Sequence, residues 1–251
     1  MTTASRATAP RGQRLAPRLA SRREGIGPLG RSGVARLTDR GTGESMPAME
    51  IDKGRFDRWA PSYDRSVFQR LIFGPVHQAA LKACLALSES PRDVLDVGCG
   101  TGRLLEIAGE HWDQVRCTGI DPSERMLAEA QRKHQGDARY TFKQGDAGAL
   151  PLESASFDVV FSTMSFHHWG DQARGIREVA RVLRPRGLFI LADLDVPLLS
   201  LLRPLLRRTE HVRMQGPEEI ARLCQEAGLL VLARHRFWPL VRAQLLIARK
   251  P

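Results

Sequence analysis

Residues 93–102 read DVLDVGCGTG, and this stretch decides the fold. Asp93–Val97 has the apolar character of a buried strand, and glycines follow at alternate positions 98, 100 and 102. Glycine allows positive φ and lets the backbone approach a ligand without a Cβ in the way. Because ligands of open α/β sheets bind at the carboxyl ends of the strands, this turn is a candidate ligand site. The stretch therefore predicts a strand, a ligand-binding turn and a helix over 103–110.

The glycine spacing argues against two classes of nucleotide ligand. A dinucleotide fingerprint, G-x-G-x-x-G, would need glycine at position 103, where Arg103 stands. The chain also has no G-x-x-x-x-G-K-[ST] loop for nucleoside triphosphates. A ligand without a pyrophosphate fits the turn better.

Strands and helices alternate on both sides of this turn. Hydrophobic periodicity predicts helices over 71–87 and 172–183, a helix that begins at Pro122 or Ser123, and a helix over 218–227 with Gly228 as its C-cap. The further strands are predicted over 115–120, 140–144, 157–162, 187–193, 229–237 and 242–250. The last two strands are joined by a short loop and should pair antiparallel. The fold class is therefore α/β, a doubly wound, mostly parallel seven-stranded sheet with an antiparallel last strand.

The stretch DVGCGTG resembles motif I of the class I S-adenosylmethionine (SAM)-dependent methyltransferases, and the element order agrees with that family from about Phe56 to Lys250. The chain is most similar to the small-molecule, type 11 group that includes quinone-biosynthesis C-methyltransferases, although those enzymes often differ from the GCGTG found here. The resemblance implies SAM as cofactor and S-adenosylhomocysteine as product. It implies cofactor contacts from Asp96, Gly98, Cys99, Gly100, Thr101 and Gly102.

Further cofactor residues follow from the same resemblance. Asp121 closes the second strand, where the family places a carboxylate that accepts both ribose hydroxyls. Asp146 and Ala147 match the adenine-contacting loop. The implied set is completed by Met126, by Thr163 and by Tyr63 in the segment FDRWAPSYD. The alternatives are ordinary structural ones: a helix-terminal aspartate for Asp121, a turn for Asp146 and a core aromatic for Tyr63.

The candidate catalytic residues lie in STMSFHHW (162–169), after the fourth strand. His167 and His168 are candidates for a general base, since a histidine of near-neutral pKa can remove a proton from a hydroxyl or an acidic carbon. The alternative is that one histidine packs and the other forms a structural hydrogen bond. We find no metal-ligand cluster and no CxxC pair, so the predicted transfer needs no metal.

A leucine- and arginine-rich segment, Pro197–Arg213, follows the fifth strand, where family members insert an acceptor lid. We expect a lid over about 196–215 that covers a lipophilic or anionic acceptor or contacts a membrane surface. The alternative is a surface helix with its leucines packed on the domain. The predicted partner is a small-molecule acceptor, lipophilic or aromatic; the oligomeric state is not indicated.

The net charge of +10 is concentrated near the N-terminus. Residues 1–45 hold nine arginines and three acidic residues, a net charge of +6, which leaves +4 for the rest. This tail has no aromatic residue and no periodicity, so we expect residues 1–48 to be disordered and the methyltransferase domain to cover 49–251. The tail is either an organellar transit peptide or a wrongly assigned start before Met46 or Met49.

The remaining classes of function are weaker alternatives. An RNA methyltransferase would use stacking aromatics, which the tail lacks, and base-N-methylating members carry an N/D-P-P-Y/F motif where this chain reads STMSFHHW; nucleic acid is not an expected partner. A non-catalytic SAM-binding regulator stays open. The sequence has no stretch of 18 apolar residues, so no membrane span is predicted. The scattered cysteines favour a reducing compartment. We expect a cytoplasmic enzyme, with organelle import through the tail as the alternative.

Overall fold

The computed structural model describes residues 71, 73–88, 90–195, 215–237 and 242–251. Its centre is a seven-stranded sheet in the order β3-β2-β1-β4-β5-β7-β6. The strands are β1 (Asp93–Val97), β2 (Arg116–Asp121), β3 (Tyr140–Gln144), β4 (Phe157–Thr163), β5 (Leu183–Leu194), β6 (Leu230–Phe237) and β7 (Ala243–Arg249). Strand β7 runs antiparallel to both of its neighbours, β5 and β6, and the other pairings are parallel. The predicted fold class is confirmed.

Five α-helices flank the sheet in the described part of the chain: α2 (Gly74–Leu85), α3 (Arg103–His111), α4 (Glu124–Lys133), α5 (Gln172–Val182) and α7 (Pro217–Glu226). Their ends follow local chemistry. Ser123 caps α4 by accepting a hydrogen bond from the Met126 amide, and Asp171 caps α5 through the Arg174 amide. Gly228, at φ +80°, ends α7 in the left-handed conformation that the sequence predicted.

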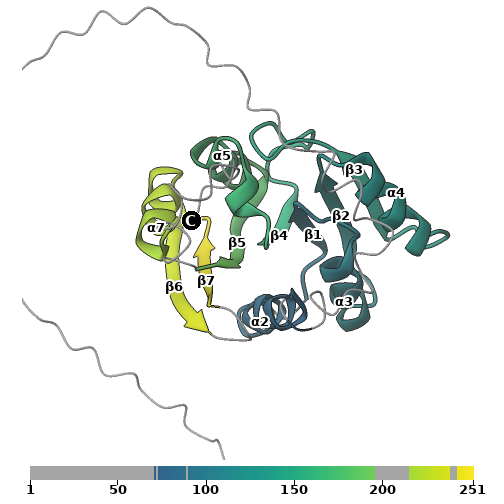
Figure 1. The fold of residues 1–251 in the computed structure, drawn as a ribbon, viewed down its shortest axis with the longest axis horizontal. Helices are drawn as coiled ribbons and strands as arrows, with labels where there is room; N and C mark the ends of the chain where they lie inside the picture. Colours follow the sequence, from purple (N-terminus) through teal and green to yellow (C-terminus); the bar gives the residue numbers. More distant parts are fainter. Residues whose placement is uncertain (1–70, 72, 89, 196–214, 238–241) are drawn as a thin grey trace, which may run out of the picture. The chain divides into compact units, whose positions relative to one another are not determined.

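The sheet is buried on both faces, as parallel sheets are. Alternate residues of the central strands enter two different hydrophobic clusters: Val94 packs with α2, α3 and α4, and its neighbour Leu95 packs with α5 and α7. Figure 1 shows α2 and α3 on one side of the sheet and α5 and α7 on the other. This two-sided burial fixes the sheet, so that the loops at its ends are held on a rigid support.

The strand order reverses between β1 and β4. From β1 the chain moves through β2 to β3 at one edge, and then returns to place β4 and β5 on the other side of β1. The loops that leave β1 and β4 therefore diverge to opposite faces and open a crevice at the carboxyl ends of these strands. The crevice is where the glycine turn after β1 lies.

Two boundaries differ from the sequence prediction. The helix predicted over 71–87 is regular only over Gly74–Leu85, with a proline in its first turn. Strand β5 begins at Leu183 and not at 187, because Leu183 already pairs with Phe157 across a bulge before the regular register resumes. The turn residue Arg186 lies within this bulge at φ +68°, a conformation that glycine adopts more easily.

Several sequence predictions concern residues outside the described part. They are the disordered tail over 1–48, the cofactor contact from Tyr63 and nearly all of the lid over 196–215. In the described residues, no helix has the length and apolar character needed to cross a membrane.

Candidate functional site

A pocket opens at the carboxyl ends of β1, β2, β3 and β4 and encloses about 980 Å³, mouth included. Ten of the residues predicted from the sequence line it: Gly98, Cys99, Gly100, Thr101, Asp121, Met126, Asp146, Ala147, Thr163 and His168. Three predicted residues do not line it: Asp96, Gly102 and His167.

The glycine turn has the backbone that its sequence predicts. Gly98, Gly100 and Gly102 have φ of +81°, +52° and +77°. A Cβ on Gly98 would lie 2.3 Å from the Ser165 Cβ, so the turn and the loop after β4 can pack this closely only with glycine here. A Cβ on Gly100 would meet no protein atom within 4 Å, because this residue faces the pocket. The turn is thus tight against the protein at Gly98 and open at Gly100.

Asp121 holds the glycine turn against the end of β2. Its Oδ2 accepts a hydrogen bond from the Gly100 amide at 2.8 Å, and its Oδ1 accepts one from the Ser123 amide at 2.9 Å. The side chain is largely buried and lines the pocket. Two backbone donors therefore fix a carboxylate in the pocket wall, at the position predicted from the sequence.

Asp96 lies at the same end of β1 but has a different environment. It is 1% exposed and does not line the pocket, and its Oδ1 has no hydrogen-bond partner in the part of the chain that the structure describes. Burial, together with the nearby charge of Asp121, raises the pKa of the Asp96 carboxyl well above its usual range. A direct cofactor contact from Asp96 stays a prediction.

The loop after β3 forms another wall of the pocket. Asp146 Oδ1 accepts a hydrogen bond from the Gly148 amide at 2.8 Å, and a single β-bridge joins Asp146 to Ala149. This compact turn holds Asp146 and Ala147 at the pocket, which the apolar side chain of Met126 also lines. The arrangement offers a carboxylate and a backbone amide beside an apolar surface.

The two predicted histidines separate into different environments on the short 3-10 helix η2 (Phe166–His168). His168 lines the pocket, whereas His167 is 9% exposed and turned to Asp193 at the end of β5. His167 Nδ1 lies 2.6 Å from Asp193 Oδ1, and the His167 amide donates to Asp193 Oδ2 at 2.9 Å. Burial lowers the pKa of His167, but the Asp193 carboxylate outweighs burial and raises it.

The structure also places residues at the site that were not selected from the sequence. Phe73 and His77 reach the pocket from α2, and Ser165 lines it after β4. Asp193 could have been found, because a polar residue that ends the buried stretch GLFILAD (187–193) lies at the same sheet edge as the glycine turn. His77 gave no such signal, since it occupies an ordinary position in a helical pattern.

Within the described residues, no group of three or more His, Cys, Asp or Glu side chains has an arrangement that could hold a metal ion. All four cysteines, Cys84, Cys99, Cys117 and Cys224, are buried free thiols.

Comparison with known proteins supports the same family. A family model described as "Methyltransferase domain" matches residues 95–191. The demethylmenaquinone methyltransferase of Deinococcus radiodurans is 34% identical over 166 residues, which cover 62% of this chain and 68% of that enzyme. The 27-O-demethylrifamycin SV methyltransferase of Amycolatopsis mediterranei is 41% identical over 104 residues, 40% of this chain and 38% of that enzyme. The chain spans 42–65% of the length of other curated relatives that it matches.

Solved structures share the fold. The methyltransferase in a complex with the Trm112 methyltransferase activator of Haloferax volcanii superposes with a TM-score of 0.66 at 22% identity, covering 78% of this chain and 97% of that one. The YcgJ protein of Bacillus subtilis gives a TM-score of 0.59 at 23% identity, with 69% and 99% covered. The glycine turn, the doubly wound sheet and the similarity to the D. radiodurans enzyme agree: the chain belongs to the class I SAM-dependent methyltransferases of the type 11 group.

Proposed function

We propose that this enzyme transfers the methyl group of SAM to a small-molecule acceptor by direct in-line displacement, without a metal. One observation carries the proposal. A single pocket brings together a glycine turn from β1, a fixed carboxylate from β2, the Asp146 turn from β3 and His168 from the segment after β4. These four elements line one ligand-binding pocket, and each offers it a different chemical group.

The residues present fit SAM in shape and in charge. Gly100 leaves open space where the backbone can approach a ligand. Asp121 and Asp146 place two carboxylates in the pocket wall, and SAM carries positive charge on its sulfonium and amino groups. A cationic ligand is therefore favoured over a polyphosphate.

We assign the following roles to the lining residues. Asp121 accepts the ribose hydroxyls, because an ionised carboxylate is an acceptor that can take a vicinal diol with both oxygens. Asp146 accepts from the exocyclic amine of adenine, and the Ala147 amide donates to a ring nitrogen. Met126 and Thr163 pack against the cofactor, with Met126 contributing apolar surface. These assignments extend to Tyr63 only as a prediction from the sequence.

SAM supplies an already activated methyl group when it is bound. The protein must hold the acceptor atom in line with it and exclude water, and such positioning lowers a barrier by roughly 7–11 kcal/mol. We assign the acceptor-side proton transfer to His168, which lines the pocket, and not to His167, which is bonded to Asp193. The acceptor then has a removable proton, as a phenol or hydroquinone does. The names of the relatives, which methylate demethylmenaquinone and demethylrifamycin, support an acceptor of this class.

We further propose that the enzyme works in the cytoplasm on an aromatic or lipophilic acceptor and does not bind nucleic acid. Four free, buried thiols suit a reducing compartment.

Isothermal titration of the full chain with SAM, and then with S-adenosylhomocysteine, tests the cofactor. Saturable binding of both is expected, and a folded protein that binds neither would contradict the proposal. An acceptor screen that begins with phenols and hydroquinones follows. Tight SAM binding without turnover of any acceptor would favour a non-catalytic SAM-binding regulator.

The variant His168→Ala tests the acceptor side. We expect unchanged SAM affinity and a kcat reduced by about 10²–10⁴-fold, the usual contribution of a general base. His235 is an exposed histidine on β6, and His235→Ala is therefore the control, which should leave both the SAM affinity and kcat unchanged. Loss of SAM binding in His168→Ala would rule out a purely acceptor-side role.

A further inference from the structure

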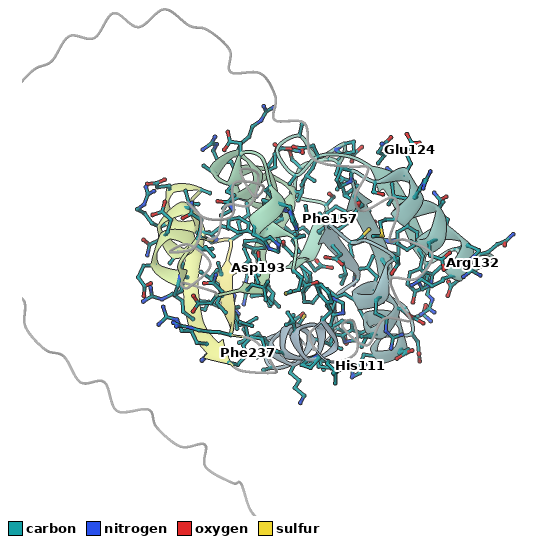
Figure 2. All side chains as sticks on the ribbon, viewed as in Figure 1. His111, Glu124, Arg132, Phe157, Asp193 and Phe237 are labelled. Atoms are coloured by element: carbon teal, nitrogen blue, oxygen red, sulfur yellow. The ribbon has the colours of Figure 1, made fainter. Side chains whose placement is uncertain are left out.

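Asp193 is a buried acid that the proposed roles above do not use. It lies one residue before the end of β5, next to the end of β4, and is 2% exposed; it is labelled in Figure 2. Three donors converge on its carboxylate: the His167 amide at 2.9 Å, the His167 ring at 2.6 Å and the Leu194 amide at 2.7 Å. A buried carboxylate is stable only with such partners. Two of the three donors belong to one residue.

These contacts determine the state of the His167 ring. A carboxylate only accepts hydrogen bonds, so His167 Nδ1 must carry the hydrogen that lies between it and Asp193. The negative charge also favours a second proton on this ring, and the pKa of His167 is raised for that reason although burial opposes it. Asp193 is the one charged side chain, among the described residues, that shifts this group.

His168 lies directly beside this ring. The centroids of the two imidazoles are 4.0 Å apart, with the ring planes tilted by 45°. Two positive charges at this separation repel each other, so a proton on His167 disfavours one on His168. The other titratable side chains that share the pocket with His168 are His77, Cys99, Arg103, Asp121 and Asp146.

We propose that Asp193 is a positioning residue of the active site. It binds both the backbone and the ring of His167, and so fixes the turn that presents His168 to the pocket. It also assigns the positive charge of the histidine pair to His167, which leaves His168 as the neutral imidazole that can accept a proton. This inference rests on the proposed role of His168 and extends it to a three-residue unit.

The test is an NMR titration of the histidine ring signals in the full chain, with S-adenosylhomocysteine present. His167→Asn and His168→Asn assign the two signals in the wild-type background. In Asp193→Asn, which keeps the shape but removes the charge, we expect the His168 signal to titrate about one pH unit higher than in the wild type. His167→Asn, whose amide can still donate to Asp193, should move the His168 signal in the same direction, because the neighbouring positive charge is absent.

Asp195→Asn is the matched control. Asp195 is a second buried acid at the same strand end, but its ion-pair partners are Arg236 and Arg242 and not a histidine. We expect no shift of the His168 signal in this variant. A purely structural role for Asp193 would disturb the turn without moving the His168 midpoint in His167→Asn, and an unchanged midpoint in both Asp193→Asn and His167→Asn would overturn the inference. The readout does not require an acceptor, so failure of the proposed methyl transfer would be seen separately in the binding and turnover experiments.

Discussion

The two ends of strand β1 each carry an aspartate, and their environments are opposite. At the amino end, Asp93 binds Arg116 at 2.6 Å and Arg184 at 2.7 Å. Near the carboxyl end, Asp96 is buried, and its Oδ1 has no hydrogen-bond partner among the described residues. One carboxylate is compensated by the protein itself, and the other is not.

The neighbouring strands repeat this contrast. Asp158, at the amino end of β4, binds Arg184 at 2.8 Å and accepts hydrogen bonds from the amides of Arg92 and Asp93. Burial raises the pKa values of Asp93 and Asp158, but the arginines and other donors outweigh it and lower both. At the other edge, the pKa of Asp96 is raised. The carboxylates at the amino edge of the sheet are thus stabilised in their charged form, whereas burial at the carboxyl edge favours the neutral form of Asp96.

The largest expected effect comes from Gly98→Ala at the carboxyl edge. The added Cβ would lie 2.3 Å from the Ser165 Cβ, at a backbone φ of +81°. Steric overlap and backbone strain together should lower the free energy of unfolding by about 2–4 kcal/mol. Thermal or urea unfolding measures this loss, with SAM titration as the second readout.

Gly100→Ala is the matched variant for the same turn. Its Cβ would meet no protein atom within 4 Å, so only backbone strain remains, about 1 kcal/mol. Because this Cβ would enter the ligand space, SAM affinity should fall more than stability does. Equal losses of stability in Gly98→Ala and Gly100→Ala would contradict the view that the turn is packed against protein at Gly98 and faces open space at Gly100.

Asp121→Ala should weaken SAM binding by about 1–3 kcal/mol, the cost of losing charge-assisted hydrogen bonds, with the fold retained. Asp93→Ala is the comparison at the amino edge, where a carboxylate is also lost but the ligand is distant. Calorimetric titration should show unchanged SAM affinity in Asp93→Ala, with a lower melting temperature. If both variants bound SAM as the wild type does, the ribose assignment of Asp121 would be wrong.

Arg184→Met tests the stabilising role of the amino edge. It removes two ion pairs at a side chain that is one-third exposed, so we expect a loss of only about 1–2 kcal/mol. The pKa values of Asp93 and Asp158 are lowered in the folded state, so this stability is present above the unfolded value of 3.8 and is lost as the pH falls through the folded values. Urea unfolding at pH 7 and at pH 3 should therefore show a smaller difference between variant and wild type at the lower pH.

Asp96→Asn should have the smallest effect, and in the opposite direction. The folded-state pKa of Asp96 is raised, so its ionised form destabilises the fold increasingly as the pH rises above the unfolded value of 3.8. Removing the charge should stabilise the ligand-free protein by about 1 kcal/mol at pH 7 and have little effect below pH 3.8. SAM affinity should fall at the same time. A variant that is less stable than the wild type at pH 7 would contradict this account of the carboxyl edge.

Much of the fold could be predicted because its signals are local. Alternating elements, the glycine turn and caps such as Ser123 and Gly228 depend on neighbours along the chain. The start of β5 could not be predicted, because Leu183 joins the strand through its pairing with Phe157 on another strand. Local sequence patterns predict turns and periodicity, but they carry no information about the register between strands.

The site was predictable in part for the same reason. Gly98–Gly102 directly follow β1 and Asp121 ends β2, so the edge at which they lie follows from the topology. The sequence could not distinguish His167 from His168, which are adjacent, because their difference depends on Asp193, 26 positions further along. His77 reaches the pocket only because α2 packs across β4 and β5.

The position of β7 has a consequence for synthesis. This strand is the last of the seven in sequence order, yet it lies between β5 and β6, and β6 pairs with no other strand in the described sheet. While the ribosome is still adding residues 243–249, the completed β6 has no edge to join, and α7 lacks one of the two strands on which it packs. The glycine turn and the first five strands are made much earlier. We expect the cofactor half of the sheet to assemble on the nascent chain, with the final hairpin joining only when Arg249 has left the exit tunnel.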